Sequence, residues 1–147
     1  MNTRPALSVL LLIAVSGVGL ARQAQACQCG TKPPVDVALG QSDVVVAGVV
    51  TAVDQEASNP AAGALPPVSR VRIKIQKRWK GAAVSELTLT QASTCAYSFH
   101  LGRAYLVFAG SHGSPNGNVE ASKCLPNKPY AQAAPELALL GAPISNK

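Results

Sequence analysis

The chain has 147 residues, of which 48% are hydrophobic and 14% are charged, and its 13 basic and 7 acidic side chains give a formal net charge of +6. This length suits one domain with one core and excludes a chain of several domains. The mildly basic balance is compatible with a polyanion or an acidic protein partner, and it selects neither.

Residues 1–26 are predicted to be a secretory signal peptide. Arg4 supplies the positive charge near the start, residues 6–20 form an uncharged apolar run, and the small-x-small triplet Ala24-Gln25-Ala26 follows. The apolar run is short for a membrane span, which needs about 20 residues. Cleavage after Ala26 would leave a mature domain of residues 27–147 that begins with a free amine on Cys27, and it would place the protein in a periplasm or outside the cell.

A bacterial lipoprotein is the alternative, because lipoproteins are also cut immediately before a cysteine. Such sites usually carry a larger aliphatic residue three positions upstream, where this chain has Ala24. Lipidation would acylate the Cys27 amine and attach the protein to a membrane. Without it, we expect no membrane contact.

In chain order, the mature domain reads mainly as strands. Residues 43–53 form a continuous β-branched run that is typical of a buried strand, in which Gly48 permits a bulge. Residues 68–80 alternate apolar and basic side chains, as a half-exposed strand does. Three further strands are predicted at residues 86–90, 104–109 and 118–124.

The segments between and after these strands carry turn and helix signals. Residues 54–67 and 111–117 are rich in Pro, Gly, Asn and Ser, which predicts a long loop and a hairpin connection. Residues 135–140 are predicted to be a short helix that Gly141 ends. Five short antiparallel strands favour a small barrel with a C-terminal helix, although composition alone does not choose between a barrel and a sandwich.

All four cysteines, Cys27, Cys29, Cys95 and Cys124, lie in the mature domain, and export favours their pairing in disulfides. A Cys27–Cys29 bond would close a strained ring, which leaves two long-range pairings open. Either one closes long loops, each contributing about 4–5 kcal/mol by the chain-entropy estimate. A four-thiolate zinc site is the alternative, but zinc ligand pairs usually have two or more intervening residues and Cys27-x-Cys29 has one.

An ordered set of short motifs then resembles a known family. The set comprises Cys27-x-Cys29, Ser42-Asp43-Val44-Val45, Arg78-Trp79-Lys80-Gly81, Ser93-Thr94-Cys95-Ala96-Tyr97, Tyr105-Leu106-Val107 and Cys124. Together these motifs resemble the N-terminal inhibitory domain of the tissue inhibitors of metalloproteinases, which belong to the netrin-like modules and share an OB-fold barrel. The resemblance runs from residue 27 to residue 124.

The resemblance implies a mechanism and residues that carry it. It implies disulfides Cys27–Cys95 and Cys29–Cys124, and it implies that the amine and carbonyl oxygen of Cys27 replace the zinc-bound water of a target metalloprotease, the nucleophile of hydrolysis. Gln28 would enter the pocket for the substrate side chain beyond the scissile bond. We call the implied target contact the contact ridge: Cys27, Gln28, Cys29, Ser93, Thr94 and Cys95.

The chain also departs from the family pattern. The third disulfide that animal members have in this domain has no counterpart, so residues 30–41 and the terminal helix are expected to be less firmly held. Gln28 is bulkier than the small residue common at that position, which bears on target range and potency.

The rival hypothesis is a non-inhibitory netrin-like binding module that recognises an envelope or matrix component, either a protein or a polyanion. Candidate polyanion contacts are the basic residues of the second strand and its end, which more often form a solvated strand face: Arg70, Arg72, Lys74, Lys77, Arg78 and Lys80. The few aromatic residues do not favour a base-stacking platform, so no nucleic-acid partner is expected.

No enzyme activity is predicted. The sequence contains no phosphate loop, paired-histidine metal motif or nucleophile elbow, and cysteines in disulfides cannot act as nucleophiles. His100 and His112 are expected in exposed loops, and Trp79 is expected to anchor the core or its rim. We expect a monomer with no cofactor of its own, whose partner is a zinc metalloprotease.

Overall fold

The computed structural model describes residues 27–57, 67–111 and 117–145. The predicted signal peptide at residues 1–26 therefore lies outside the described residues. So do His112 and most of the two predicted connections, at residues 58–66 and 112–116.

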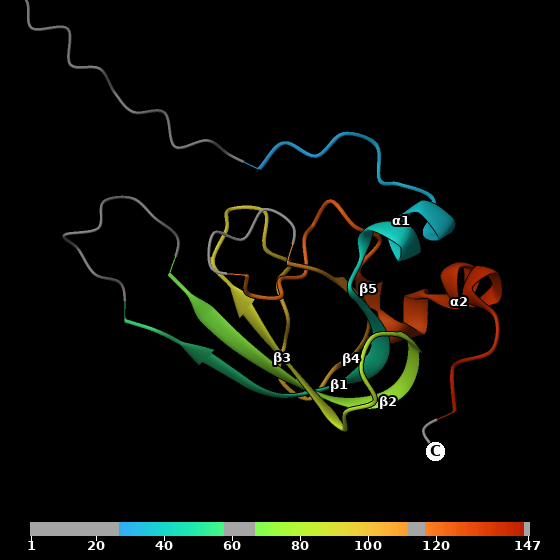
Figure 1. The fold of residues 1–147 in the computed structure, drawn as a ribbon. Helices are drawn as coiled ribbons and strands as arrows, with labels where there is room; N and C mark the ends of the chain where they lie inside the picture. The colour runs from blue at the N-terminus through green and yellow to red at the C-terminus, as the bar shows by residue number, and fades with distance from the viewer. Residues whose placement is uncertain (1–26, 58–66, 112–116, 146–147) are drawn as a thin grey trace, which may run out of the picture.

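The described residues form a mainly β structure with one five-stranded antiparallel sheet (Figure 1). Its strands are β1 (Val44–Gln55), β2 (Ser69–Lys80), β3 (Glu86–Gln91), β4 (Ala104–Ala109) and β5 (Lys128–Pro129), in the spatial order β3-β2-β1-β4-β5. In the described residues, three helical elements accompany the sheet: α1 (Val35–Gln41), the 3-10 turn η2 (Tyr130–Gln132) and α2 (Ala134–Leu140). The mainly β class, the first four predicted strands and the C-terminal helix are confirmed.

Strand β4 and the first half of β1, which pair with each other, are buried on both faces, which explains their continuous apolar sequences. Val46 and Val107 pack into one cluster with residues of β2 and β3, whereas Val45, Leu106 and Phe108 pack into a second cluster under the helices. All five side chains have 0% exposure. A strand between two apolar layers has no face left for polar residues.

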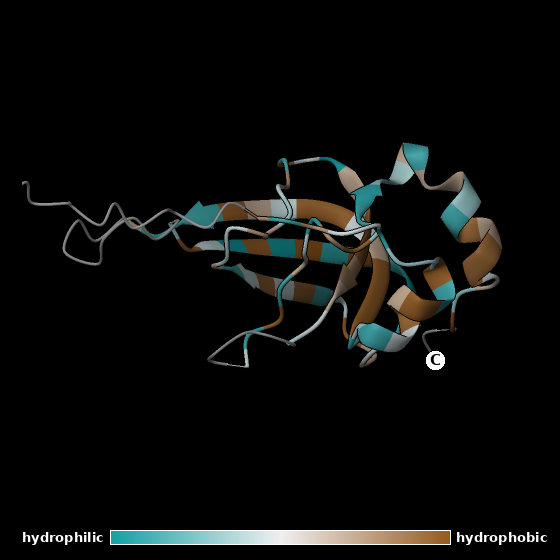
Figure 2. Ribbon diagram, turned by 90° about the horizontal axis from the view of Figure 1, so that it is seen from above, coloured by the Kyte–Doolittle hydropathy of each residue, from teal (hydrophilic) through white to brown (hydrophobic). Residues whose placement is uncertain are grey.

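β2 and β3 are buried on one face only. Val71 and Ile73 of β2 and Leu87 and Leu89 of β3 enter the first cluster, and the residues between them face outward. Figure 2 shows the resulting alternation of hydrophilic and hydrophobic residues along the strands.

Gly48 marks a bulge in β1, as the sequence analysis expects. The pairing with β2 shifts register between Ala47 and Gly48. A Cβ atom at Gly48 would overlap the carbonyl oxygen of Lys74 and lie 2.8 Å from Cγ2 of Ile73. Only glycine lets β2 approach this closely.

The expected closed barrel is not shown, because the sheet is open in the described residues. Residues 118–124, predicted to be the fifth strand, make only isolated bridges there, Gly110 with Glu120 and Ala96 with Ser122. The Thr90 N–H donates to the Val119 carbonyl at 3.0 Å, so this segment touches the β3 edge as well as the end of β4. The prediction of a strand at 118–124 is wrong, because scattered bridges do not form a ladder, and the fifth strand is the two-residue β5.

Helices α1 and α2 lie together on one side of the molecule (Figure 1). No helix was predicted at residues 35–41. Val35 and Ala38 of α1 are buried in the second cluster with Leu106, Phe108 and Ala133, and Leu137 and Leu140 of α2 pack against the same cluster. The expectation that residues 30–41 and the terminal helix are less firmly held without a third disulfide stays a prediction, although both helices have apolar contacts in the second cluster.

Polar contacts reinforce this helix layer, which we define as α1, η2, α2 and the second cluster. The Ser42 hydroxyl donates to the Ala38 carbonyl at 2.8 Å, and the Trp79 indole N–H donates to the Gly141 carbonyl at 2.9 Å. The predicted anchoring role of Trp79 is thus confirmed, since its ring also packs against the second cluster.

One ion pair lies at the base of the helix layer, between Nζ of Lys128 and Oε1 of Glu136 at 2.5 Å. Burial alone raises the pKa of Glu136. The hydrogen bonds from Lys128 and from its own backbone, together with the charges of Lys128 and Lys32, outweigh burial and hold the pKa below its ordinary value.

Candidate functional site

The structure contains the two disulfides that the resemblance implies. Cys27 is bonded to Cys95 and Cys29 to Cys124, with Cα–Cα distances of 4.9 and 5.1 Å. The Sγ atom of Cys27 lies 3.6 Å from Sγ of Cys29 and 3.8 Å from Sγ of Cys124, so the two bridges pack against each other. The two disulfides therefore fix residues 27–29 next to Cys95 and Cys124.

The same sulfur cluster does not support a structural zinc site in this form of the protein. Sγ atoms of Cys27, Cys29 and Cys124 gather within 4.8 Å of one another. All four cysteines are nevertheless in disulfides, and zinc binds thiolates.

The Cys27–Cys95 bridge brings the two halves of the predicted contact ridge together. Ser93 and Thr94 follow the end of β3 and are exposed, and the Ala96 N–H closes a turn onto the Ser93 carbonyl at 3.1 Å. Gln28 is also exposed, whereas Cys27 is half-buried. The ridge residues thus come from two segments 68 positions apart at the bridge.

Residues 119–123 support the loop that follows β3, residues 92–97, which we call the ridge loop. The Tyr97 N–H donates to the Ala121 carbonyl and the Lys123 N–H donates to the Cys95 carbonyl, both at 2.7 Å. These bonds lie on either side of the Ala96–Ser122 bridge, so a short antiparallel contact supports the loop next to the disulfide.

Two polar side chains that the sequence analysis does not single out complete this support: Gln91 and Glu120. Gln91 is only 3% exposed, and its amide nitrogen donates to the carbonyls of Tyr97 at 2.8 Å and Ala121 at 3.1 Å. Its amide oxygen accepts from the Ala121 N–H at 2.9 Å. Nothing in the local sequence distinguishes these two residues, because Ala121 lies 30 positions from Gln91 and Ser93 lies 27 positions from Glu120.

Three aromatic residues, at the end of the ridge loop, just after it and in β4, pack together. The rings of Tyr97, Phe99 and Tyr105 meet edge to face, with centroids 5.0 to 6.0 Å apart. Burial, and to a smaller degree the neighbouring Tyr105, raises the pKa of Tyr97. His100 is exposed as expected, and its Nδ1 lies 3.2 Å from the Tyr105 hydroxyl.

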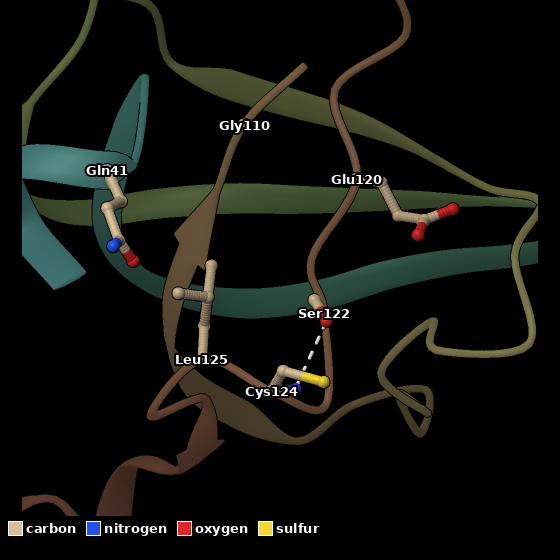
Figure 3. Close-up of a pocket in the computed structure, with 6 residues that line it drawn as sticks. All are labelled: Gln41, Gly110, Glu120, Ser122, Cys124 and Leu125. Atoms are coloured by element: carbon tan, nitrogen blue, oxygen red, sulfur yellow. Dashed lines mark hydrogen bonds between the residues drawn. The ribbon is translucent and has the colours of Figure 1, made fainter. Parts of the chain in front are cut away.

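Two hollows lie near the residues that support the contact ridge. One of about 260 Å³ is bordered by Ser93 and Tyr97 of the loop and by Val53 and Val71 of the strands. Another of about 420 Å³ lies between the end of α1 and the segment of Glu120, Ser122 and Cys124, with Gln41 and Leu125 on the opposite side (Figure 3). Only the first hollow is therefore lined by a residue of the contact ridge, Ser93.

The predicted polyanion contacts differ in their exposure and in their partners. Arg70, Arg72 and Lys74 alternate on the exposed face of β2. Two of them are paired across the strand, Arg70 with Glu56 at 2.8 Å and Arg72 with Asp54 at 3.8 Å. Acidic partners reduce the positive potential that a polyanion would meet.

The other three basic residues have contacts within the fold. Lys77 donates to the Tyr130 hydroxyl at 2.8 Å, and Lys80 donates to the Leu39 carbonyl at 2.8 Å. Arg78 is 9% exposed and donates to the Gly81 carbonyl at 2.9 Å. The structure thus gives Arg78 and Lys80 contacts that hold the end of β2.

No protein-family model and no curated protein matches this chain. The likeness to the metalloproteinase inhibitors therefore rests on the motifs quoted from the sequence. In the part of the chain that the structure describes, none of the helices is long and apolar enough to cross a lipid bilayer.

Proposed function

We propose that this protein is a secreted inhibitor of zinc metalloproteases. In the proposed mechanism, removal of residues 1–26 frees the Cys27 amine, and this amine and the Cys27 carbonyl oxygen bind the catalytic zinc of the target. The zinc-bound water that attacks the substrate is displaced, so hydrolysis stops without a covalent step.

The observation that carries this proposal is the pair of packed disulfides at Cys27 and Cys29. A chelating amine and carbonyl must be presented in a fixed direction, and a free chain end would lose considerable conformational entropy on binding. Bridges to Cys95 and Cys124 remove much of that freedom before the target arrives. They also set Cys27 beside the exposed Ser93 and Thr94, which would contact the target next to its zinc.

Gln28 is the residue that would enter the target's specificity pocket. It is exposed between the two bridged cysteines, so its side chain is available to a partner. A glutamine is long and polar, and it would favour proteases whose pocket accepts an extended side chain and offers hydrogen-bond partners.

The amine must be uncharged to bind zinc. A free α-amine has an ordinary pKa of about 7.7–8.0, so part of it is neutral near pH 7.5 and zinc draws it further toward the neutral form. Inhibition should therefore strengthen between pH 6.5 and 8.5, within the range where the protease itself remains active.

The decisive experiment compares two forms of the protein on a panel of zinc metalloproteases. Intact mass and N-terminal sequencing first establish whether the mature chain starts at Cys27 with a free amine. A variant with one alanine before Cys27 keeps both disulfides but moves the amine away from the zinc. We expect inhibition constants to rise by at least about a hundredfold for the extended form, since two metal bonds are lost.

Equal inhibition by the two forms would contradict chelation. Inhibition of no protease by the unextended form would favour the rival hypothesis, a non-inhibitory binding module. Binding of the same sample to immobilised heparin, with Arg70→Gln and Arg72→Gln as variants, tests the polyanion form of that rival.

A further inference from the structure

Glu120 is clamped to the end of β4 by its main chain. Its N–H donates to the Gly110 carbonyl and its carbonyl accepts from the Gly110 N–H, both at 3.0 Å. These two bonds form one of the isolated bridges of the structure. The Glu120 side chain therefore starts from a fixed point of the fold.

From that point, the carboxylate of Glu120 reaches the ridge loop. Oε2 accepts hydrogen bonds from the N–H groups of Ala92 at 2.8 Å and Ser93 at 3.0 Å, and Oε1 accepts one from the Ser93 hydroxyl. Figure 3 shows the carboxylate directed away from Gln41 and Leu125, which lie on the far side of the hollow. One side chain thus holds two consecutive backbone donors and one side-chain donor.

This arrangement decides which hydrogen-bonding groups Ser93 has left for a partner. An ionised carboxylate can only accept hydrogen bonds, so Ser93 must use its single hydroxyl hydrogen toward Glu120. The Ser93 N–H is used in the same way. What the exposed Ser93 side chain retains is the lone pairs of its oxygen, which only accept.

We propose that Glu120 is a positioning residue of the contact ridge, and that it makes Ser93 a hydrogen-bond acceptor toward a donor group, such as a backbone N–H, on the target protease. This inference rests on the proposed function. It adds a specificity requirement: the target must present a donor where Ser93 meets it. Bonds to a charged carboxylate are shorter and stronger than neutral ones, which suits a group that must hold a small loop still.

The fold of the ridge loop does not depend on the carboxylate alone, which makes the inference testable. Gln91 keeps three hydrogen bonds of its own, the Lys123 N–H still donates to Cys95, and the Cys27–Cys95 bridge remains. Changes at Glu120 should therefore alter the loop locally and leave the domain folded.

The test uses the mature protein with five variants, the fifth being Ser93→Thr, and two independent measurements. Glu120→Gln is isosteric, but its amide can donate to Ser93 Oγ and so reverse the hydrogen-bond direction. Glu120→Ala removes the carboxylate, and Ser93→Ala removes the acceptor. Glu86→Gln is the matched control, because Glu86 is an exposed carboxylate at the start of β3, the strand that leads into residues 92–97. The measurements are amide hydrogen exchange at Ala92, Ser93 and Lys123, and inhibition of a protease that the unmodified protein inhibits.

In Glu120→Ala, we expect exchange at Ala92 and Ser93 to accelerate at least about tenfold, with Lys123 unchanged, and inhibition to weaken about tenfold or more. Glu120→Gln should weaken inhibition by a similar factor at an unchanged melting temperature, which a purely structural role would not produce. Ser93→Ala should weaken inhibition while the Ala92 amide stays protected, and Ser93→Thr, which keeps the hydroxyl, should restore it. Glu86→Gln should match the unmodified protein in both measurements.

Unchanged exchange at Ala92 and Ser93 in Glu120→Ala would show that the Glu120 carboxylate does not hold the ridge loop. Accelerated exchange with unchanged inhibition in both Glu120 variants would overturn its role toward the target. If the unmodified protein inhibits no protease, the proposed function fails and the role toward a target fails with it. The exchange measurement needs no protease, so it separates these cases.

Discussion

Two regions of this small domain are held together by different forces. The N-terminal corner, which we define as residues 27–29, 92–95 and 122–124, is mostly exposed or half-buried and depends on two disulfides. The helix layer has no cysteine and depends on apolar side chains of 0 to 8% exposure between the helices and the central strands.

The difference shows what each region is suited to do. Apolar burial needs a covered surface, so it cannot fix a segment that must stay accessible to a partner. Disulfides restrict a chain without covering it. The corner can therefore be rigid and exposed at once, which is what a presented chain end requires, whereas the helix layer stabilises the sheet from behind.

Removing a disulfide should have the largest effect on stability. The two bridges close loops of 68 and 95 residues. The chain-entropy estimate assigns each about 4–5 kcal/mol of the free energy of unfolding. We expect the double variants Cys27→Ser with Cys95→Ser, and Cys29→Ser with Cys124→Ser, to lose about that amount in urea denaturation.

Hydrogen exchange on the same disulfide variants shows which of the two regions loses its structure first. Amides of residues 92–97 should lose protection before those of α1 and α2, because the helix layer contains no part of either bridge. Earlier loss of protection in α1 and α2 would show that the disulfides also stabilise the helix layer, and would contradict the comparison.

Leu106→Ala should have the next largest effect and the opposite pattern. Leu106 is fully buried in the second cluster, and deleting such a side chain typically costs about 3 kcal/mol through lost burial and the cavity that remains. Protection in α1 and α2 should fall while both disulfides stay formed. Leu101→Ala is the matched control, because Leu101 is 66% exposed and its loss should change the unfolding free energy by less than about 0.5 kcal/mol.

The smallest effect is expected from the Lys128–Glu136 pair of the helix layer. Because the folded-state pKa of Glu136 is lowered, its ionised form stabilises the fold at a pH above the ordinary value of 4.5, and this stabilisation is lost as the pH falls through the lower, folded-state pKa. We expect Glu136→Gln to cost about 1 kcal/mol at pH 7 and the gap to close in acid.

Urea denaturation of both proteins from pH 7 down to pH 2.5 checks this dependence. Glu56→Gln serves as control, since Glu56 also pairs with a basic residue but is half exposed, and exposed pairs contribute little. A gap between Glu136→Gln and the unmodified protein that is constant with pH would contradict the assigned ionisation.

Local pattern was sufficient for most of the sheet. Burial leaves a pattern among neighbouring residues: a β-branched run in β1, an alternation in β2 and an apolar block in β4. The ends of these strands could therefore be predicted to within one or two residues. The short helix α2 was predictable from the proline in its first turn and from Gly141 at its end.

Other elements could not be read from local pattern. Helix α1 has seven residues, no side-chain cap and a glycine in its last turn, so its own sequence barely favours a helix, and packing of Val35 and Ala38 against Leu106 stabilises it. The error at residues 118–124 has a related cause. Their apolar and polar pattern fits a strand. In the fold, however, this segment pairs with Gly110 and Ala96, which belong to two different segments, so the contacts are isolated bridges.

Composition and neighbouring residues were enough to predict the first four strands, the C-terminal helix and the even set of four cysteines, whereas Gln28, Ser93 and Thr94 were singled out only through the family resemblance. Only the tertiary structure decided that the described sheet stays open, that two helices share one apolar layer, and that Glu120 meets the loop at Ser93. These features join residues tens of positions apart, and their energy comes from contacts that no local segment contains.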